Sequence, residues 1–152
     1  MKLDRYEVKA GKKLTSFQFI SEGPKGQIPK MIQFTATNYK DLYNLAFGDL
    51  QIETGQINDI VISNNGDSEM VLATVVATVY AFTDIYSDAW VYATGSTQAR
   101  TRLYRIGVSK YITEVEKDFL VYGQIHNEWE PFVKDVDYEA FVVKRKKRNF
   151  EL

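Results

Sequence analysis

Alternating apolar and polar residues dominate the first third of the chain. Residues 16–19 ("SFQF") and 31–35 ("MIQFT") place large apolar side chains at every second position. This period of two is typical of strands that bury one face. The intervening "EGPKG" carries its proline and second glycine at the turn positions that favour them. We therefore predict a hairpin over residues 16–35, with a shorter strand near residues 6–9 at its edge.

A second strand pair is consistent with residues 42–63. "LYNLAFGDL" and "INDIVIS" are apolar runs on either side of "QIETG", in which Gly55 marks a turn. Residues 42–47 also show helical spacing and follow Asn38, a residue type that caps helices. The pattern leaves both interpretations of residues 42–47 open.

A long helix is predicted to begin after "NNGDSE", residues 64–69. Asp67 and Glu69 place negative charge at the positive end of its dipole. The β-branched residues of "TVVATVY" would also suit a strand, but the length of the segment and its capping residues favour a central, largely covered helix. Its apolar residues recur at helical spacing, and they are Leu72, Val75, Val76, Val79, Phe82 and Tyr86.

The rest of the chain alternates between short strands and helices. "DAWVYAT" is predicted as a strand, and "STQARTRLYRIG" as a helix that stops at Gly107. A further helix is expected over residues 109–119, before strands around residues 120–122 and 138–143. The sequence thus predicts an α+β fold, in which a mostly antiparallel, twisted sheet of about six to eight strands packs around the Val-rich helix, with one or two further helices.

Composition and charge narrow the setting. The 152 residues fit a single domain, residues 1–152, with a short basic tail from about residue 144. Nineteen basic and twenty acidic side chains give a net charge of -1, so no global positive field attracts nucleic acid or anionic lipid.

Cysteine usage and hydropathy point to a cytoplasmic protein. The sequence has no cysteine, which excludes disulfides and thiolate chemistry, and its N-terminus does not have the pattern of a signal peptide. The longest uncharged stretch, residues 70–83, is shorter than the roughly 20 residues that cross a bilayer. We expect no membrane contact, and the oligomeric state stays open.

The turn between the predicted strand and the basic helix is the candidate binding site. Gly95 permits close approach to the backbone, and Ser96 and Thr97 stand at a helix start whose unpaired amides suit an anion. Arg100 and Arg102 could add charge-assisted hydrogen bonds to phosphate or carboxylate. In the structural alternative, the hydroxyls only cap the helix and the arginines pair with acidic residues. The spacing matches neither a P-loop nor a dinucleotide fingerprint.

The remaining charged residues carry weaker signals. Asp67 and Glu69 are weak candidates for a catalytic base, although turns and helix starts favour acids in any case. The acids lack the register of a calcium loop, and a single histidine, His126, cannot form a multi-histidine site, so we expect no metal and no resident cofactor. The run "KRKKR", residues 144–148, is of a type that contacts nucleic-acid phosphates, but the near-zero net charge does not favour that partner.

Several blocks of the sequence resemble a family of small uncharacterised proteins from Bacteroidetes. They include "SEGPKGQIPKMIQFT", "NNGDSEMVLATVVATVYAFT" and "DAWVYATGSTQARTRLYR". The resemblance implies a bacterial cytoplasmic setting and brings no activity or site residue with it. "RTRLYRIGV" is also similar to the late helix of GNAT acetyltransferases, where a tyrosine precedes a Lys/Arg-x-Gly-Phe-like end. The Arg/Gln-x-x-Gly-x-Gly/Ala segment with which that family binds pyrophosphate has no counterpart in this sequence.

These features lead to three functional hypotheses. The first is a binding module for an anionic or phosphate-bearing small molecule at residues 95–97. The second is an enzyme, either nucleotide- or RNA-directed and toxin-like with Asp67 or Glu69 as base, or acetyltransferase-like. The third is a protein-interaction module that uses exposed aromatic residues such as Trp129. The sequence does not decide whether the protein is an enzyme.

Overall fold

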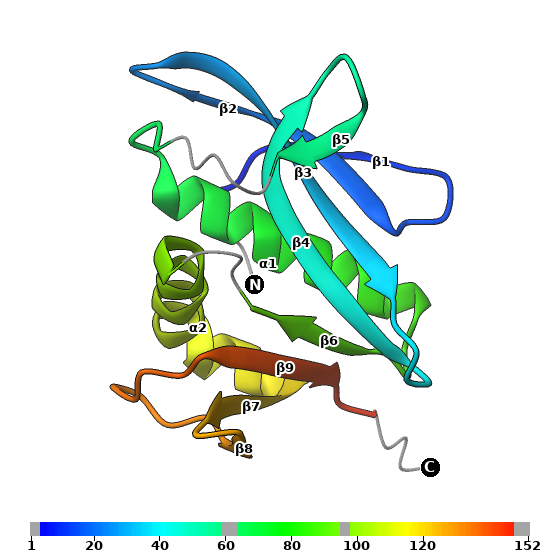
Figure 1. Cartoon of the computed structure of the whole chain (residues 1–152), viewed down its shortest axis with the longest axis vertical. Helices are drawn as coiled ribbons and strands as arrows, with labels where there is room; N and C mark the ends of the chain where they lie inside the picture. The colour runs from blue at the N-terminus through cyan, green and yellow to red at the C-terminus, as the bar shows by residue number, and fades with distance from the viewer. Residues whose placement is uncertain (1–3, 59–63, 95–97, 148–152) are drawn as a thin grey trace.

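The computed structural model describes residues 4–58, 64–94 and 98–147, apart from the side chains of residues 99 and 100. Within these ranges the chain forms two helices on one face of a large twisted sheet (Figure 1). The elements, in chain order, are β1 (Lys9–Ala10), β2 (Ser16–Gly23), β3 (Gly26–Ala36), β4 (Leu42–Gln51), β5 (Gln56–Asn58), α1 (Ser68–Ile85), β6 (Trp90–Ala93), α2 (Gln98–Asp118), β7 (Phe119–Ile125), β8 (Glu128–Pro131) and β9 (Ala140–Arg145).

The strands form one sheet in the order β1-β2-β3-β4-β6-β9-β7-β8, and β5 pairs with β4 beside this path. Among the described strands, β4 and β6 are parallel and every other pair is antiparallel. The predicted α+β class is therefore confirmed. Within the described residues the sheet has nine strands, slightly more than the predicted six to eight.

The first predicted hairpin is confirmed as β2 and β3. Its register pairs Phe17 with Ile32 and closes at Gly23 and Gly26, so the turn consists of two residues. Phe17 and Ile32 are buried on the face that carries the helices. The period of two in the sequence thus reflects one buried face and one largely exposed face, on which Met31 is the buried exception in β3.

Residues 42–47 form a strand, so the helical interpretation of this segment is wrong. Leu45 and Phe47 are buried, whereas Ala46 between them and Asn44 before them are partly exposed, as alternation in a strand requires. Pairing with β3 along one edge satisfies the backbone of β4 and outweighs the helical spacing of its leucines. The partner strand β5 ends at Asn58 among the described residues, and residues 59–63 of the predicted strand lie outside them.

Helix α1 begins at Ser68, as predicted. Asp67 occupies the N-cap position, but its side chain makes no capping hydrogen bond. The helix lies across the sheet, where the Phe82 ring is fully buried and stacks on Phe34 with centroids 4.2 Å apart. By length and hydropathy alone α1 could span a membrane, and its burial against the sheet gives a physical reason for its apolar sequence.

Helix α2 is continuous through Gly107, so the predicted stop at this residue and the separate helix over residues 109–119 are wrong. Glycine in a helix interior costs about 1 kcal/mol relative to alanine. Here the glycine lets the two helices approach, because a Cβ atom on Gly107 would lie 2.8 Å from Cδ2 of Leu72 in α1. The close approach of α1 explains a glycine that sequence rules read as a terminator.

The C-terminal strands include one that the sequence analysis did not predict. β7 contains the strand predicted around residues 120–122, β9 begins two residues later than the strand predicted around residues 138–143, and β8 pairs with β7 through a two-residue turn. His126 and Asn127 form this turn with positive φ angles of 52° and 62°, the conformation of a type I′ hairpin turn. The only histidine of the chain therefore lies exposed in a turn.

Candidate functional site

The parallel pair in the sheet is short. Residues 42–44 of β4 pair with residues 90–92 of β6. Beyond this point β4 continues to its pairing with β5, whereas β6 ends at Ala93. The two strands therefore separate towards their carboxyl ends, which is where ligands bind in many open sheets that contain parallel strands.

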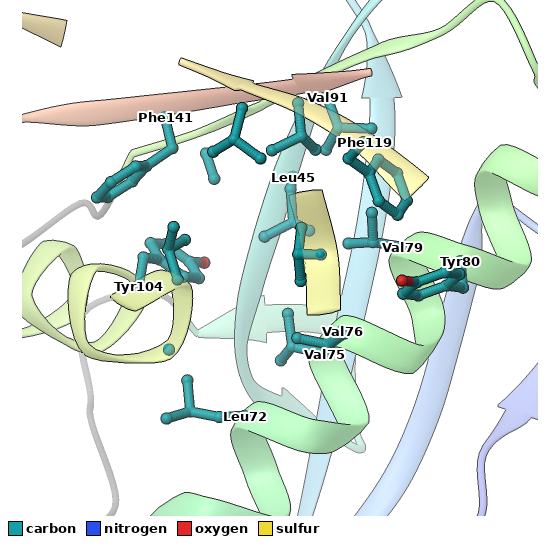
Figure 2. Close-up of a pocket in the computed structure, with 16 residues that line it drawn as sticks. Leu45, Leu72, Val75, Val76, Val79, Tyr80, Val91, Tyr104, Phe119 and Phe141 are labelled. Atoms are coloured by element: carbon teal, nitrogen blue, oxygen red, sulfur yellow. The ribbon is translucent and has the colours of Figure 1, made fainter. Parts of the chain in front are cut away.

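A cavity of about 100 Å³ lies under this junction, between the sheet and both helices (Figure 2). Helix α1 contributes one wall with Leu72, Val76 and Val79, and α2 contributes Tyr104. The sheet supplies the floor from β4, β6, β7 and β9, including Phe141. The cavity thus joins segments that are almost 100 residues apart in the sequence.

The cavity is suited to an apolar group of limited size. Its lining is aliphatic and aromatic, and the side-chain hydroxyls come from Tyr80 and Tyr104. A 150 Å³ apolar cavity in another protein holds benzene, so about 100 Å³ accommodates roughly four carbon atoms by proportion. An ion would lose its hydration there without a partner of opposite charge, which excludes a charged group from the interior.

Tyr80 fixes one side of this cavity. Its hydroxyl donates a hydrogen bond of 2.6 Å to Oδ2 of Asp118, at the end of α2, and its ring packs edge-on against Phe119. Burial, followed by the hydrogen bond to the Asp118 carboxylate, raises the pKa of Tyr80 well above its ordinary value. The contact ties the last turn of α2 to the middle of α1.

Alkaline pH is expected to remove the stabilisation that Tyr80 provides. Because the native pKa is raised, Tyr80 ionises first in the unfolded chain, near pH 10, so its contribution is complete below about pH 10 and is lost as the pH rises further. Urea unfolding should show a constant stability gap between wild type and Tyr80→Phe from about pH 8 to pH 9.5, and a gap that narrows as the pH rises above about 10. Tyr39→Phe is the control, because Tyr39 is 74% exposed. A gap for Tyr80→Phe that stays constant with pH would contradict this role.

The predicted anion site falls largely outside the described residues. Gly95, Ser96 and Thr97 lie outside them, as does the side chain of Arg100. Arg102 is exposed on α2. The cavity wall includes Ala93, two residues before Gly95 in the sequence. In the sequence, the predicted anion site therefore follows closely on a residue of the cavity wall.

The two candidate catalytic acids do not line the cavity. The Asp67 carboxylate accepts hydrogen bonds of 2.5 Å from the hydroxyls of Tyr6 and Ser21, and Ser21 is fully buried. Burial and the bond to Asp67 raise the pKa of Tyr6. Glu69 forms an exposed ion pair with Lys110 of α2. These contacts fasten the start of α1 to its surroundings.

No group of three or more metal-ligating side chains occurs within the described ranges. Neither the cavity nor Tyr80 was predicted from the sequence, and Tyr104 was noted only within the segment that is similar to GNAT acetyltransferases. Valines at helical spacing predict a buried helix face equally well with or without a cavity beside it. The one local signal of the cavity was Gly107, which lies in the cavity wall and has no side chain to fill the space.

Comparison with known proteins identifies a family but no activity. No curated protein and no solved structure matches the chain significantly. Residues 2–146 match the model of DUF6934, a family of unknown function. The chain therefore belongs to this family.

Proposed function

We propose that the protein binds a small ligand that combines a short apolar group with an anionic group. The apolar group occupies the cavity between α1, α2 and the sheet. The anionic group binds at residues 95–97, with Arg100 and Arg102 as its cationic partners. The observation that carries the proposal is the apolar cavity at the point where β4 and β6 separate.

The energetics of the cavity support a ligand there. Cavities in protein cores cost about 24 cal/mol per Å³, so 100 Å³ corresponds to about 2 kcal/mol of lost stability. An apolar group of matching size recovers part of this free energy through burial and dispersion contacts. Binding of a short hydrocarbon group in this cavity is therefore favourable, whereas a uniformly packed core has no space for such a group.

The anionic part of the proposal comes from the chain around the start of α2. The interior of the cavity excludes charge, so a polar group of the ligand must lie at its edge. Ala93 lies in the cavity wall and precedes Gly95, the first residue of the predicted anion site, by two residues in the sequence. Exposed Arg102 and the amides at a helix start are the groups that bind phosphate or carboxylate there.

Acyl transfer is a second candidate function, and the position of Tyr104 favours it. This tyrosine belongs to the segment "RTRLYRIGV" that is similar to the late helix of GNAT acetyltransferases, and it lines the cavity in Figure 2. Two features speak against the likeness: α2 continues past Gly107 to Asp118, and the pyrophosphate-binding motif is missing from the sequence. Plain binding is therefore the better supported function.

Thermal shift with n-alkyl phosphates from methyl to hexyl tests the proposal, with inorganic phosphate as the bare anion. A ligand that binds only the native state raises the melting temperature. We expect the largest rise at a chain of about four carbon atoms, in proportion to the cavity volume. Val76→Phe, which fills the cavity, should remove the dependence on chain length, and Arg102→Ala should weaken all members of the series alike.

Val133→Phe is the matched control, because Val133 is 54% exposed and lies outside the cavity. A rise that is the same for every chain length, or a chain-length dependence that survives in Val76→Phe, would contradict binding in the cavity. Acetyl-coenzyme A in the same assay addresses acyl transfer. A rise with acetyl-coenzyme A that Tyr104→Phe leaves unchanged would remove the role of Tyr104 in that alternative.

A further inference from the structure

The sheet has a second face, and part of it is aromatic. The register places Trp90 and Tyr92 of β6, Tyr122 of β7 and Trp129 of β8 on the side opposite the cavity-lining residues. We call these four residues the outer aromatic surface. Their rings form two contacts, Trp90 with Tyr122 at 6.1 Å and Tyr92 with Trp129 at 6.0 Å between centroids.

The outer aromatic surface is partly open to solvent. Trp129 is 42% exposed and the other three rings are half-buried, while Leu120, beside Tyr122 on the same face of β7, is 40% exposed. Both helices contribute to the cavity on the other face of the sheet, so neither covers these rings. Large aromatic side chains gathered on an uncovered face are typical of binding surfaces.

Two lysines provide positive charge beside the outer aromatic surface. Lys144 of β9 shares its row of the sheet with Trp90 and Leu120. Among the described residues, the outward-facing positions of β6, β7, β8 and β9 include no carboxylate. Nearby Asp88 is 4.0 Å from the ammonium groups of both Lys144 and Lys147, so one acid faces two cations. Lys144 and Lys147 belong to the basic run that the proposed function does not use.

We propose that the outer aromatic surface binds single-stranded nucleic acid. Bases stack on aromatic rings whatever their sequence, and lysines beside the rings neutralise the backbone phosphates. A single strand exposes its bases for this contact, whereas a duplex does not. The favourable charge is local, so it acts despite the net charge of -1 of the whole chain.

Fluorescence anisotropy with labelled oligo(dT) and oligo(U) of about ten nucleotides, titrated with the full chain, tests this proposal. We expect binding that weakens as salt rises and that exceeds binding to a duplex of equal length. Trp129→Ala should weaken it at least fivefold, the lower limit of base–aromatic stacking, and Trp129→Phe should retain most of it. Ile52→Ala is the control, because Ile52 is another large exposed apolar residue and lies in the β4–β5 turn, at the end of β4 opposite to the pairing with β6.

Variants that change the charge beside this surface provide an independent test, because they are expected to change the affinity for nucleic acid in opposite directions. Asp88→Asn should tighten binding, because it releases Lys144 and Lys147 for phosphate, while Lys147→Gln should weaken binding and lower the salt dependence. Asp88 and Lys147 are 68% and 80% exposed, so neither change threatens the fold. Lys117→Gln, on α2, should leave binding unchanged.

Three results would overturn the proposal. The first is no binding at low salt, and the second is equal affinity for single strand and duplex, which would exclude base stacking. The third is self-association in analytical ultracentrifugation that Trp129→Ala abolishes, since the surface would then contact a second copy of the chain. The cavity lies on the opposite face, so the outcome is independent of the proposed ligand.

Discussion

Replacing Phe82 by alanine is expected to lower the free energy of unfolding by about 3–5 kcal/mol, the range for large aromatic side chains in cores. Phe82 is fully buried in α1 and lies at the centre of a ring cluster. Its ring stacks on Phe34 of β3 and contacts Tyr43 of β4 and Tyr86, with centroids 4.2, 5.1 and 4.7 Å away. The substitution therefore removes contacts between the helix and the first half of the sheet.

Urea unfolding followed by circular dichroism measures this loss, and Ile85→Ala is the matched control. Ile85 lies one turn further along α1 but is 61% exposed, so its replacement should change the stability by well under 1 kcal/mol. A similar loss in both variants would mean that Phe82 acts through helix propensity rather than through its burial.

Gly123→Ala is expected to cause the second large loss, at or above the upper end of the 1–3 kcal/mol typical of overpacked cores. A Cβ atom on Gly123 of β7 would lie 2.4 Å from Cγ and Cδ1 of Tyr138. Tyr138 is fully buried, and its hydroxyl accepts a hydrogen bond from Val133 N and donates one to Glu130. The ring cannot move aside without breaking these bonds.

Gln124→Ala on the same strand is the control for Gly123→Ala. Gln124 points to the opposite face of β7, so its replacement leaves Tyr138 in place. Thermal unfolding of the two variants should differ by several degrees, since 1 kcal/mol corresponds to about 2–4 °C at this chain length. Equal melting temperatures would show that the ring of Tyr138 does not depend on the glycine beside it.

The sequence predicted those parts of the fold that local patterns determine. The hairpin of β2 and β3 combines alternation with turn residues, and α1 combines periodicity with a clear N-terminal signal. Both signals come from residues close together in the chain. Alternation and helical spacing conflicted only at residues 42–47, where pairing with β3 decided for a strand.

The errors occurred where distant contacts override local preference. Gly107 ends helices by local rules, but the approach of Leu72 makes a glycine suitable inside α2. Strand β8 is four residues long, and its turn places His126 and Asn127, rather than glycine, at positive φ. Such a short strand with an uncommon turn gives little signal in a single sequence.

The candidate site was less predictable than the fold. Valines and aromatic residues that line the cavity have the same sequence pattern as residues of a filled core. A cavity depends on how α1, α2 and four strands meet, which no local pattern records. The outer aromatic surface likewise depends on the register of β6, β7 and β8, and only Trp129 was named among its residues beforehand.

The short parallel ladder between β4 and β6 has a mechanical consequence. Three residue pairs join the halves of the sheet, and α1 bridges them by packing Phe82 on β3 and Tyr80 against β7. Twisting of one half against the other therefore strains few backbone hydrogen bonds and is resisted chiefly by side chains of one helix. The pairing of β4 with β6 would therefore act as a hinge between the two halves of the sheet, and α1 restrains their relative movement. A ligand in the cavity below β4 and β6 would restrict this movement further.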